Sequence, residues 1–349
     1  MATEQLRSRP LDELVLTVVV DNETDGLSSV GPGVPQESEM VGQVARGTPV
    51  PLSDEHTCIE VFDHLCVGCH GFSVVATGRI GDETHTVLFD AGPYGDVWEA
   101  NASRLGVDLA AIEAVFLSHW HWDHSGALPA AVAAVAAARA AAGLAPPVVD
   151  LHPDRPDQRG VEAVPGLLVT LPPEPTFDDL ATAGGEVVTH ADAHLVAGGF
   201  FLGSGAIERV TSYETGLPGH HSIVGGEAVP DPLIMDERFL AAEVAGRGVT
   251  VLSACSHAGV VNACLAAKAA FEGTGVDLVV GGYHLAGASM ESRIPETVRD
   301  LDERIAPAVV APGHCTGWRA KAALATRFTP DRYGPSVVGS RYVLRAEPG

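Results

Sequence analysis

Short apolar runs separated by turn-forming residues predict a series of β-strands in this chain. Residues 14–20 (LVLTVVV) are rich in valine and end at Asp21, which is typical of a buried strand. Residues 71–77 and 86–89 flank a turn that contains Gly81 and predict a β-hairpin. Similar apolar segments predict further strands at 114–117, 148–151, 167–171, 199–202, 239–245, 249–254, 278–281 and 308–311.

Helices are expected between several of these strands. Residues 128–142 are mostly alanine, the residue with the highest helix propensity, and Gly143 follows them. Segments at 96–105, 260–272 and 295–305 also fit helices. Hairpins and crossover helices in one chain predict two mixed sheets with helices outside them. The expected fold is therefore α/β, with four layers in the order αββα.

Residues 22–56 interrupt this pattern. They contain many Gly, Pro, Ser and acidic residues without a sustained period. A long stretch of this kind inside a domain is usually a functional loop or a disordered segment. We expect residues 1–349 to form a single domain with a loop or lid insertion at about 22–56, and both interpretations of the insertion stay open.

The charge of the chain excludes some classes of partner. It has 21 basic and 45 acidic side chains, a net charge of −24, which repels the phosphates of nucleic acids and anionic lipids. With 46% hydrophobic and 19% charged residues, the composition is that of a globular protein. We expect a small-molecule substrate, and neither nucleic acid nor membrane as a partner. The oligomeric state is left open.

We expect neither a secretion signal nor a membrane span in this chain. Residues 14–20 are short and run into Asp21 without a small-residue cleavage site. Residues 126–149 are mostly alanine and contain Arg139, so they are a poor membrane span. The six cysteines of such a chain are expected to be reduced thiols. The predicted location is the cytoplasm.

The strongest chemical signal follows the strand expected at 114–117. Residues 118–124 read SHWHWDH. Two histidines spaced by two can point to the same side of an extended turn, and an Asp-His pair then opens a helix. Imidazole and carboxylate ligands suit Zn²⁺, and also Fe or Mn. The sequence therefore predicts a metal site, with one or two ions, that includes His119, His121, Asp123 and His124.

The motif H-x-H-x-D-H, which continues as Ser-Gly-Ala, resembles the metallo-β-lactamase superfamily. The resemblance implies an αββα sandwich with a metal site at one edge. Residues 253–259 (SACSHAG) resemble the third motif of the family, and 312–314 (PGH) resemble the last. The resemblance thus implies two sets of metal ligands. The first set is His119, His121 and His257, and the second is Asp123, His124 and His314.

The fourth motif departs from the superfamily. Most members have an Asp there that bridges two metals, whereas residues 281–284 of this chain read GGYH. A neutral imidazole offers one nitrogen to one metal, while a carboxylate can bridge two. His284 therefore ligates a single metal, contacts substrate, acts as an acid or base, or is simply a buried structural histidine. The departure argues against a tightly coupled dinuclear centre.

Further blocks narrow the resemblance to one branch, named for 7,8-dihydropterin-6-methyl-4-(β-D-ribofuranosyl)-aminobenzene-5′-phosphate synthase. The blocks are VDN at 20–22, HGFS at 70–73 and LFDAG at 88–92, with CSHAG, GGYHL and PGHCTG. The match is weak at 22–56 and 150–235. In this pattern Asp90 supports the metal loop by orienting a ligand histidine. Asn22 either faces the pocket or forms a turn.

Other features carry weaker signals. Cys66-x-x-Cys69-His70 matches the attachment motif of c-type haem, but that attachment belongs to exported proteins. A structural zinc site there lacks a second Cys-x-x-Cys. Cys255 and Cys315 stand next to proposed ligands and are interpreted as small buried residues that could tune the site. Histidines interpreted as surface residues, one of which could reach the mouth of the pocket, are His190, His194, His220 and His221.

Together these features predict a metal-dependent hydrolase. A metal lowers the pKa of its bound water to about 7 and polarises a carbonyl or phosphoryl oxygen. The predicted catalytic residues are Asp123, which accepts a proton from the nucleophile, and His284, which assists the leaving group. The substrate is expected to be a small ester or phosphoester metabolite. Cationic residues suggested for a phosphate are Arg209, Arg293 and Arg319.

Two alternatives to hydrolysis stay open. The first, implied by the resemblance, is a dihydropterin-linked transferase or synthase in which the metal acts as a Lewis acid. The second is a non-catalytic metal or metabolite sensor on the same fold. The intact ligand set argues against the sensor, because a binding module has no need for a carboxylate beside three histidines.

Overall fold

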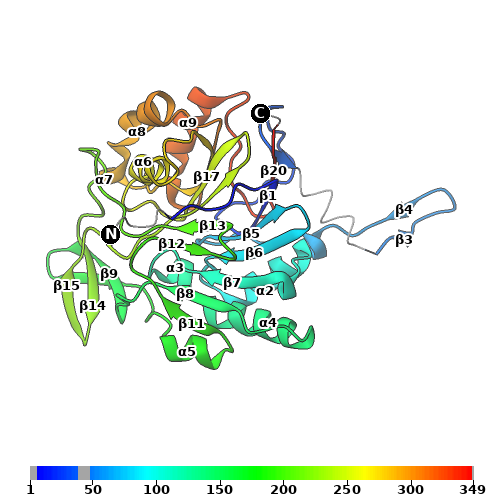
Figure 1. Cartoon of the computed structure of the whole chain (residues 1–349), viewed down its shortest axis with the longest axis horizontal. Helices are drawn as coiled ribbons and strands as arrows, with labels where there is room; N and C mark the ends of the chain where they lie inside the picture. Colours follow the sequence, from blue (N-terminus) through cyan, green and yellow to red (C-terminus); the bar gives the residue numbers. More distant parts are fainter. Residues whose placement is uncertain (1–5, 38–47, 348–349) are drawn as a thin grey trace.

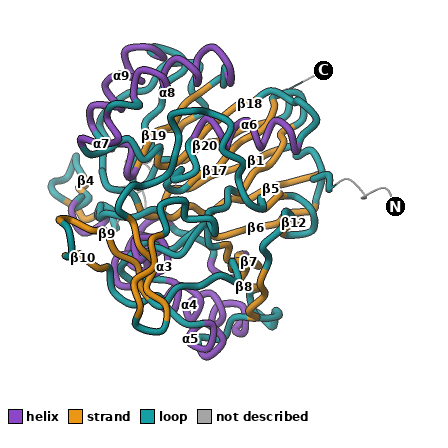
Figure 2. Tube along the Cα trace, turned by 90° about the vertical axis from the view of Figure 1, so that its left-hand side faces the viewer, coloured by secondary structure: helices purple, strands orange, loops and turns teal. Residues whose placement is uncertain are grey.

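Two β-sheets pack face to face in the middle of the molecule, and helices cover the outer face of each sheet (Figure 1 and Figure 2). The structure is a computed structural model that describes residues 6–37 and 48–347. The four-layer αββα arrangement predicted from the sequence is confirmed.

The first sheet has eight strands in the order β11-β8-β7-β6-β5-β1-β20-β2. Its strands β6, β7 and β8 are parallel, so the loops that follow them leave from one edge. The bounds are β1 (Glu13–Val20), β2 (Gln36–Glu37), β5 (Ser73–Ile80), β6 (Glu83–Phe89), β7 (Ile112–Phe116), β8 (Val148–Leu151), β11 (Glu186–Thr189) and β20 (Arg341–Arg345).

The second sheet has six strands in the order β12-β13-β16-β17-β18-β19. The last three are parallel, and Gly281 of β18 pairs with Ser253 of β17 and Pro312 of β19. The loops after these strands therefore begin at the same level. The bounds are β12 (His194–Val196), β13 (Phe201–Gly203), β16 (Leu240–Val244), β17 (Gly248–Ser253), β18 (Val276–Gly282) and β19 (Val309–Gly313).

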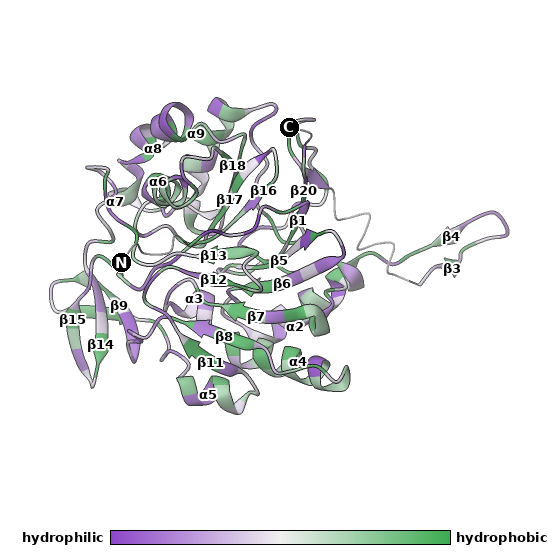
Figure 3. Ribbon diagram, in the orientation of Figure 1, coloured by the Kyte–Doolittle hydropathy of each residue, from purple (hydrophilic) through white to green (hydrophobic). Residues whose placement is uncertain are grey.

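Side-chain alternation along the strands produces the layers. In β7, Phe116 joins the apolar cluster between the two sheets, while its neighbour Val115 packs on the opposite face. In β17, Leu252 faces the other sheet and Val251 faces the helices above it. Both strands are buried on two faces, which explains their nearly continuous apolar sequences (Figure 3).

Helices close the two outer faces. The first sheet is covered by α2 (Gly95–Leu105), α4 (Leu128–Ala141) and α5 (Phe177–Thr182). The second is covered by α6 (Val260–Ala270), α8 (Ile294–Asp300) and α9 (Trp318–Phe328). The short helical turns are η1 (Phe62–His64), η2 (Leu109–Ala111), α3 (Trp122–Ser125), α7 (Ala288–Glu291), η3 (Leu301–Ile305) and η4 (His314–Thr316). Within the described residues, no helix has the length and apolar character needed to cross a membrane.

Most of the predicted elements are confirmed, but three of the four strands of a third sheet escaped prediction. It has the strand order β10-β9-β14-β15, and β10 is the strand expected at 167–171. Residues of β15 are exposed along its whole length, and β9 and β14 are buried only in part, so no regular burial pattern marks these three strands in the sequence. Its bounds are β9 (Gln158–Val164), β10 (Leu167–Thr170), β14 (His220–Val224) and β15 (Glu227–Pro230).

The insertion predicted at 22–56 is described in part, because residues 38–47 lie outside the described residues. Strands β3 (Val50–Pro51) and β4 (Thr57–Cys58) form a small hairpin that extends away from the two sheets (Figure 1). Strand β2 pairs with β20 at the end of the large sheet. Whether residues 1–349 act as a single domain with a lid stays a prediction.

Candidate metal centre

Three histidine nitrogens converge where the loops after β7 and β17 meet. His119 Nε2 lies 3.0 Å from His121 Nδ1, and His257 Nε2 lies 3.2 Å from each of them. All three side chains are buried. In a tetrahedral zinc site with Zn–N bonds near 2.0–2.1 Å, the nitrogens lie about 3.3 Å apart. The triangle therefore has the dimensions of a metal-binding set.

Hydrogen bonds behind His119 determine which of its nitrogens is free. The Ser118 hydroxyl donates to Asp90 Oδ2 at 2.7 Å. Its oxygen therefore accepts the proton of His119 Nδ1, 2.8 Å away. His119 Nε2 then carries a lone pair that points toward the centre of the triangle.

The same argument applies to His121. His220 Nδ1 lies 2.7 Å from the Asp231 carbonyl oxygen, which can only accept, so His220 Nε2 has no proton. His121 Nε2 therefore donates to it across 2.9 Å, and His121 Nδ1 is left with a lone pair. Two lone pairs that face each other at 3.0 Å repel, unless a cation lies between them. This donor arrangement fits a metal ion.

Burial also keeps the first set in its ligating state. It lowers the pKa of His119, His121 and His257 well below the ordinary value, so each imidazole is neutral at pH 7. Metal ligation requires a neutral imidazole, and these three need no deprotonation to provide it.

The second predicted set also assembles. Asp123 Oδ2 lies 3.3 Å from His314 Nε2 and 3.7 Å from His124 Nε2. On the more exposed side, His70 Nε2 lies 3.4 Å from the same oxygen. Burial opposes ionisation of Asp123, but the surrounding imidazoles outweigh it and hold the pKa of this carboxyl well below its usual range. An ionised carboxylate and two buried imidazoles therefore face one space beside the first set.

Asp90 orients His124 from behind. Its Oδ2 accepts a hydrogen bond from His124 Nδ1 at 2.8 Å, and its Oδ1 accepts from the Ser118 backbone N–H at 2.7 Å. Burial opposes a charge on His124, but Asp123 and Asp90 outweigh it and raise the pKa of His124 to about 9. Asp90 itself has φ of 55°, a conformation that Asp and Asn tolerate better than other side chains. The hydrogen bond expected between Asp90 and a histidine of the motif is thus present, and the ligand role of His124 stays a prediction.

Asn22 points into the centre rather than forming only a turn. Its Oδ1 accepts from His314 Nδ1 at 3.0 Å and from the Gly71 backbone N–H at 3.2 Å. Its Nδ2 donates to His70 Nδ1 at 3.0 Å. One amide therefore orients two histidines around the Asp123 carboxylate.

His284 and Cys255, whose roles the sequence left open, both lie beside the metal-binding histidines. The His284 ring lies 4.3 Å from the His257 ring between centroids, and its donor atom groups with the thiols of Cys255 and Cys315. Cys255 Sγ lies 3.3 Å from His124 Nε2. The sequence suggested a small buried residue that could tune the site. A single cysteine has no spacing pattern that would mark it as a ligand.

His220 was misread as a surface residue. It lies on β14 with 2% of its surface exposed, in contact with His121. Burial lowers the pKa of His220 to about 4. By contrast, His190 and His194 stack at 3.8 Å and bond to Asp150, which also pairs with Arg238. This second group is a hydrogen-bonded network with its own arginine.

Among the described residues, the arginines suggested for a phosphate contact backbone carbonyls or a glutamate, not the metal-binding sets. Arg209 and Arg293 donate to backbone carbonyls, and Arg319 pairs with Glu291 at 2.9 Å. A phosphate-binding role for these arginines stays a prediction. Across the described ranges, the groups of potential metal donors contain none of Cys58, Cys66 and Cys69.

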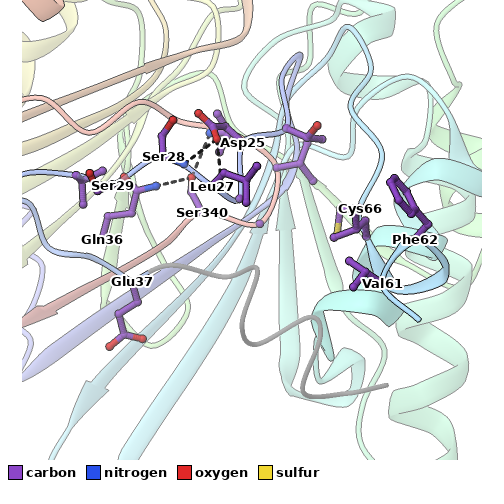
Figure 4. Close-up of a pocket in the computed structure, with 17 residues that line it drawn as sticks. Asp25, Leu27, Ser28, Ser29, Gln36, Glu37, Val61, Phe62, Cys66 and Ser340 are labelled. Atoms are coloured by element: carbon purple, nitrogen blue, oxygen red, sulfur yellow. Dashed lines mark hydrogen bonds between the residues drawn. The ribbon is translucent and has the colours of Figure 1, made fainter. Parts of the chain in front are cut away.

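A cavity of about 640 Å³ lies outside the metal centre. Figure 4 shows Gln36 and Ser340 on one wall, joined by a 2.8 Å hydrogen bond, and Phe62 and Cys66 on the opposite wall. None of the residues of the two metal sets lines it. The lining comes from the segments 24–30, 36–37, 61–66 and 337–340.

The fold agrees with the comparisons to known proteins. Residues 70–232 match the family model of the metallo-β-lactamase superfamily. The crystal structure of Tm1679, a metal-dependent hydrolase of the β-lactamase superfamily, has a TM-score of 0.64 and 21% identity to this chain. That match covers 94% of this chain and 98% of the other, and it supports the fold.

A curated relative points to one branch of the superfamily. The chain is 27% identical over 279 residues to the 7,8-dihydropterin-6-methyl-4-(β-D-ribofuranosyl)-aminobenzene-5′-phosphate synthase of Methanocaldococcus jannaschii. The alignment covers 75% of this chain and 86% of the relative. The resemblance found in the sequence motifs is confirmed, and the superfamily fold implies binding of a divalent metal.

Proposed function

We propose that this chain is a metal-dependent hydrolase of a small ester or phosphoester metabolite. The observation that carries the proposal is the triangle of buried histidine nitrogens, 3.0–3.2 Å apart, beside an ionised carboxylate. Zn²⁺ is the expected ion, with Fe or Mn as alternatives. One ion would be held by His119, His121 and His257, and a second by Asp123, His124 and His314.

A divalent metal in this place would supply a Lewis acid and a water that ionises near neutral pH. Asp123 faces the same space and accepts the proton of the attacking water. His284, whose ring lies 4.3 Å from that of His257 between centroids, donates a proton to the leaving group. Burial opposes a charge on His284, but Cys315 and Glu237 outweigh it and raise its pKa, which keeps that proton available.

The charge of the chain supports a small substrate. A cationic centre in a protein of net charge −24 is a local positive spot in a negative field. A compact anion can reach it, whereas a nucleic acid would meet repulsion along its whole length. The cytoplasmic location expected from the sequence stays a prediction.

A synthase is the second candidate function. It is favoured by the 27% identity to the dihydropterin-linked synthase of M. jannaschii. In this case the metals would act as Lewis acids in the condensation of a dihydropterin with a ribosylated aminobenzene phosphate. Formation of a pterin product, measured beside ester hydrolysis in the same preparation, separates the two functions.

The test of hydrolysis combines elemental analysis with a substrate panel. Purified protein is expected to contain divalent metal and to hydrolyse members of a panel of lactones, carboxyl esters, phosphomonoesters and phosphodiesters. Removal of the metal by a chelator abolishes turnover, and added Zn²⁺ restores it. The double variant Asp123→Ala, His124→Ala loses both turnover and metal.

Full turnover by the metal-free protein would contradict the proposal. Bound metal without turnover on any ester or pterin substrate would favour a sensor. The variant His221→Ala is the control for loss of a histidine. His221 follows His220 in sequence, but its Nδ1 bonds to the Gly219 carbonyl oxygen instead of to a residue of the metal centre.

A further inference from the structure

Cys255 lies between the two metal-binding sets. Its sulfur falls within 4.8 Å of the donor atoms of Asp123, His124 and His314, and also within 4.8 Å of those of His119 and His257. In the part of the chain that the structure describes, it is the residue shared by both sets. We propose that the Cys255 thiolate is a protein ligand common to the two metal positions. This inference rests on the metal centre of the proposed function.

The distances suit a shared sulfur ligand. With Zn–S bonds of 2.3 Å and Zn–N bonds near 2.05 Å, a tetrahedral ion separates its sulfur and nitrogen ligands by about 3.6 Å. Cys255 Sγ lies 3.3 Å from His124 Nε2. The cysteine is 2% exposed, so its sulfur faces the centre rather than solvent.

The loop that carries Cys255 is held in one conformation. Ser256 has φ of 59°, and its hydroxyl donates to the Gly282 carbonyl oxygen at 2.7 Å. The buried Glu237 carboxyl accepts the backbone N–H groups of His257 at 2.7 Å and Ala258 at 2.6 Å. These bonds hold the side chains of Cys255 and His257 toward the centre.

Strand β18, which ends between the two ligand-bearing strands, provides no competing carboxylate. It ends at Gly281 and Gly282. A Cβ at Gly281 would lie 2.0 Å from the Ser253 carbonyl oxygen, and one at Gly282 would lie 2.6 Å from Cys315 Sγ. No side chain fits at either position, because the backbone of Ser253 and Ala254 and the thiol of Cys315 already occupy the space.

Cys315 packs against the proposed ligand. The two sulfur atoms lie 3.4 Å apart, so Cys255 Sγ has one sulfur neighbour in addition to the metal-binding sets. The expected centre therefore combines imidazole, carboxylate and one thiolate. Sulfur ligation favours Zn²⁺ and Co²⁺ over Mg²⁺ and Mn²⁺, so the inference also restricts the class of metal.

Cobalt substitution tests the sulfur ligand directly. Metal-free protein loaded with Co²⁺ is expected to show the near-ultraviolet charge-transfer absorption of a thiolate-to-cobalt bond. Cys255→Ser removes this band and lowers the amount of tightly bound cobalt, whereas Cys315→Ser keeps the band. Cys69→Ser, at a half-buried thiol outside both sets, is the matched control and also keeps it.

X-ray absorption of the zinc-loaded wild type gives a second measurement that needs no variant. A sulfur neighbour at about 2.3 Å is expected. Two bound ions without a sulfur neighbour, or a cobalt band that survives in Cys255→Ser, would overturn the inference. A sulfur-ligated centre that hydrolyses nothing on the panel leaves the inference standing and removes the proposed function. Turnover at a metal centre without a sulfur neighbour would overturn the inference and leave the proposed function standing. Failure to bind any metal would overturn both the inference and the proposed function.

Discussion

His220 accepts a hydrogen bond from His121 across 2.9 Å, and its own Nδ1 donates to the Asp231 carbonyl oxygen at 2.7 Å. The two histidines are 99 residues apart in the chain. Because His220 accepts from Nε2 of His121, it directs Nδ1 of that ring toward the metal position. Its contribution to metal binding is indirect, through the tautomer of a ligand.

Replacement of His220 by alanine is expected to weaken binding of the first metal by roughly 10–100-fold, the usual effect of losing such a partner. His220→Gln, whose side-chain oxygen can accept the same hydrogen bond, restores part of the affinity. Competition with a chelator of known affinity measures the change. His221→Ala, one residue away, keeps the wild-type value, and equal affinities for all four proteins would contradict this role.

Asp90 contributes to the second metal position, because it orients His124, and this effect is separate from that of His220 on the first. Asp90→Asn tolerates φ of 55°, but its amide NH₂ meets the proton donors on Ser118 or His124. We expect the fold to persist and affinity for the second metal to fall by about 10–100-fold. Metal titration followed by elemental analysis measures the loss, and circular dichroism checks the fold. Unchanged binding of two ions would show that Asp90 has no part in the orientation of His124.

The predictable part of this centre was local in sequence. Asp123 and His124 lie on the same loop as His119 and His121, so their spacing alone indicated a metal site. The strands that carry the loops were also predictable, because β7 and β17 are buried on both faces and their sequences are nearly continuous apolar runs.

Residues that come from distant segments were not predictable in the same way. His220 lies on β14, a short and mostly half-buried strand without a regular hydrophobic pattern, so neither the strand nor its inward face could be inferred. Cys255 meets His124 across 131 positions of sequence. Such contacts depend on the packing of two sheets, which no local spacing encodes.

Glu174 is expected to make stability depend on pH. It is 3% exposed, and burial raises its pKa to about 7, against about 4.3 in an unfolded chain. Between these values the folded state binds more protons than the unfolded state, so this carboxyl lowers the free energy of unfolding as pH rises. Glu174→Gln stays neutral and avoids this loss.

The variant is therefore expected to gain about 3 kcal/mol relative to wild type between pH 4 and pH 7.5. Urea unfolding of both metal-free proteins at several pH values measures the difference. Glu227→Gln, at an exposed carboxyl on β15, controls for the general effect of removing a negative charge. A Glu174→Gln difference that does not change with pH would show that the buried carboxyl does not titrate in this range.

Gly313 leaves room for the carboxylate that positions His314. Asp21 Oδ1 accepts from the His314 backbone N–H at 2.8 Å, and Ser336 donates to the other oxygen at the same distance. A Cβ at Gly313 would lie 2.2 Å from Asp21 Oδ2, although its φ of −132° is open to any residue. The glycine is thus needed for close approach and not for backbone freedom.

Gly313→Ala is therefore expected to displace Asp21, with a cost of about 1–3 kcal/mol in the free energy of unfolding and weaker binding of the second metal. Gly275→Ala is the matched control, since no atom lies within 4 Å of its Cβ position. Thermal unfolding with and without added Zn²⁺ measures both effects. If Gly313→Ala keeps the full stabilisation by zinc, Asp21 does not position His314. If it loses the stabilisation while Gly275→Ala retains it, the second set depends on this one close contact between β19 and the end of β1.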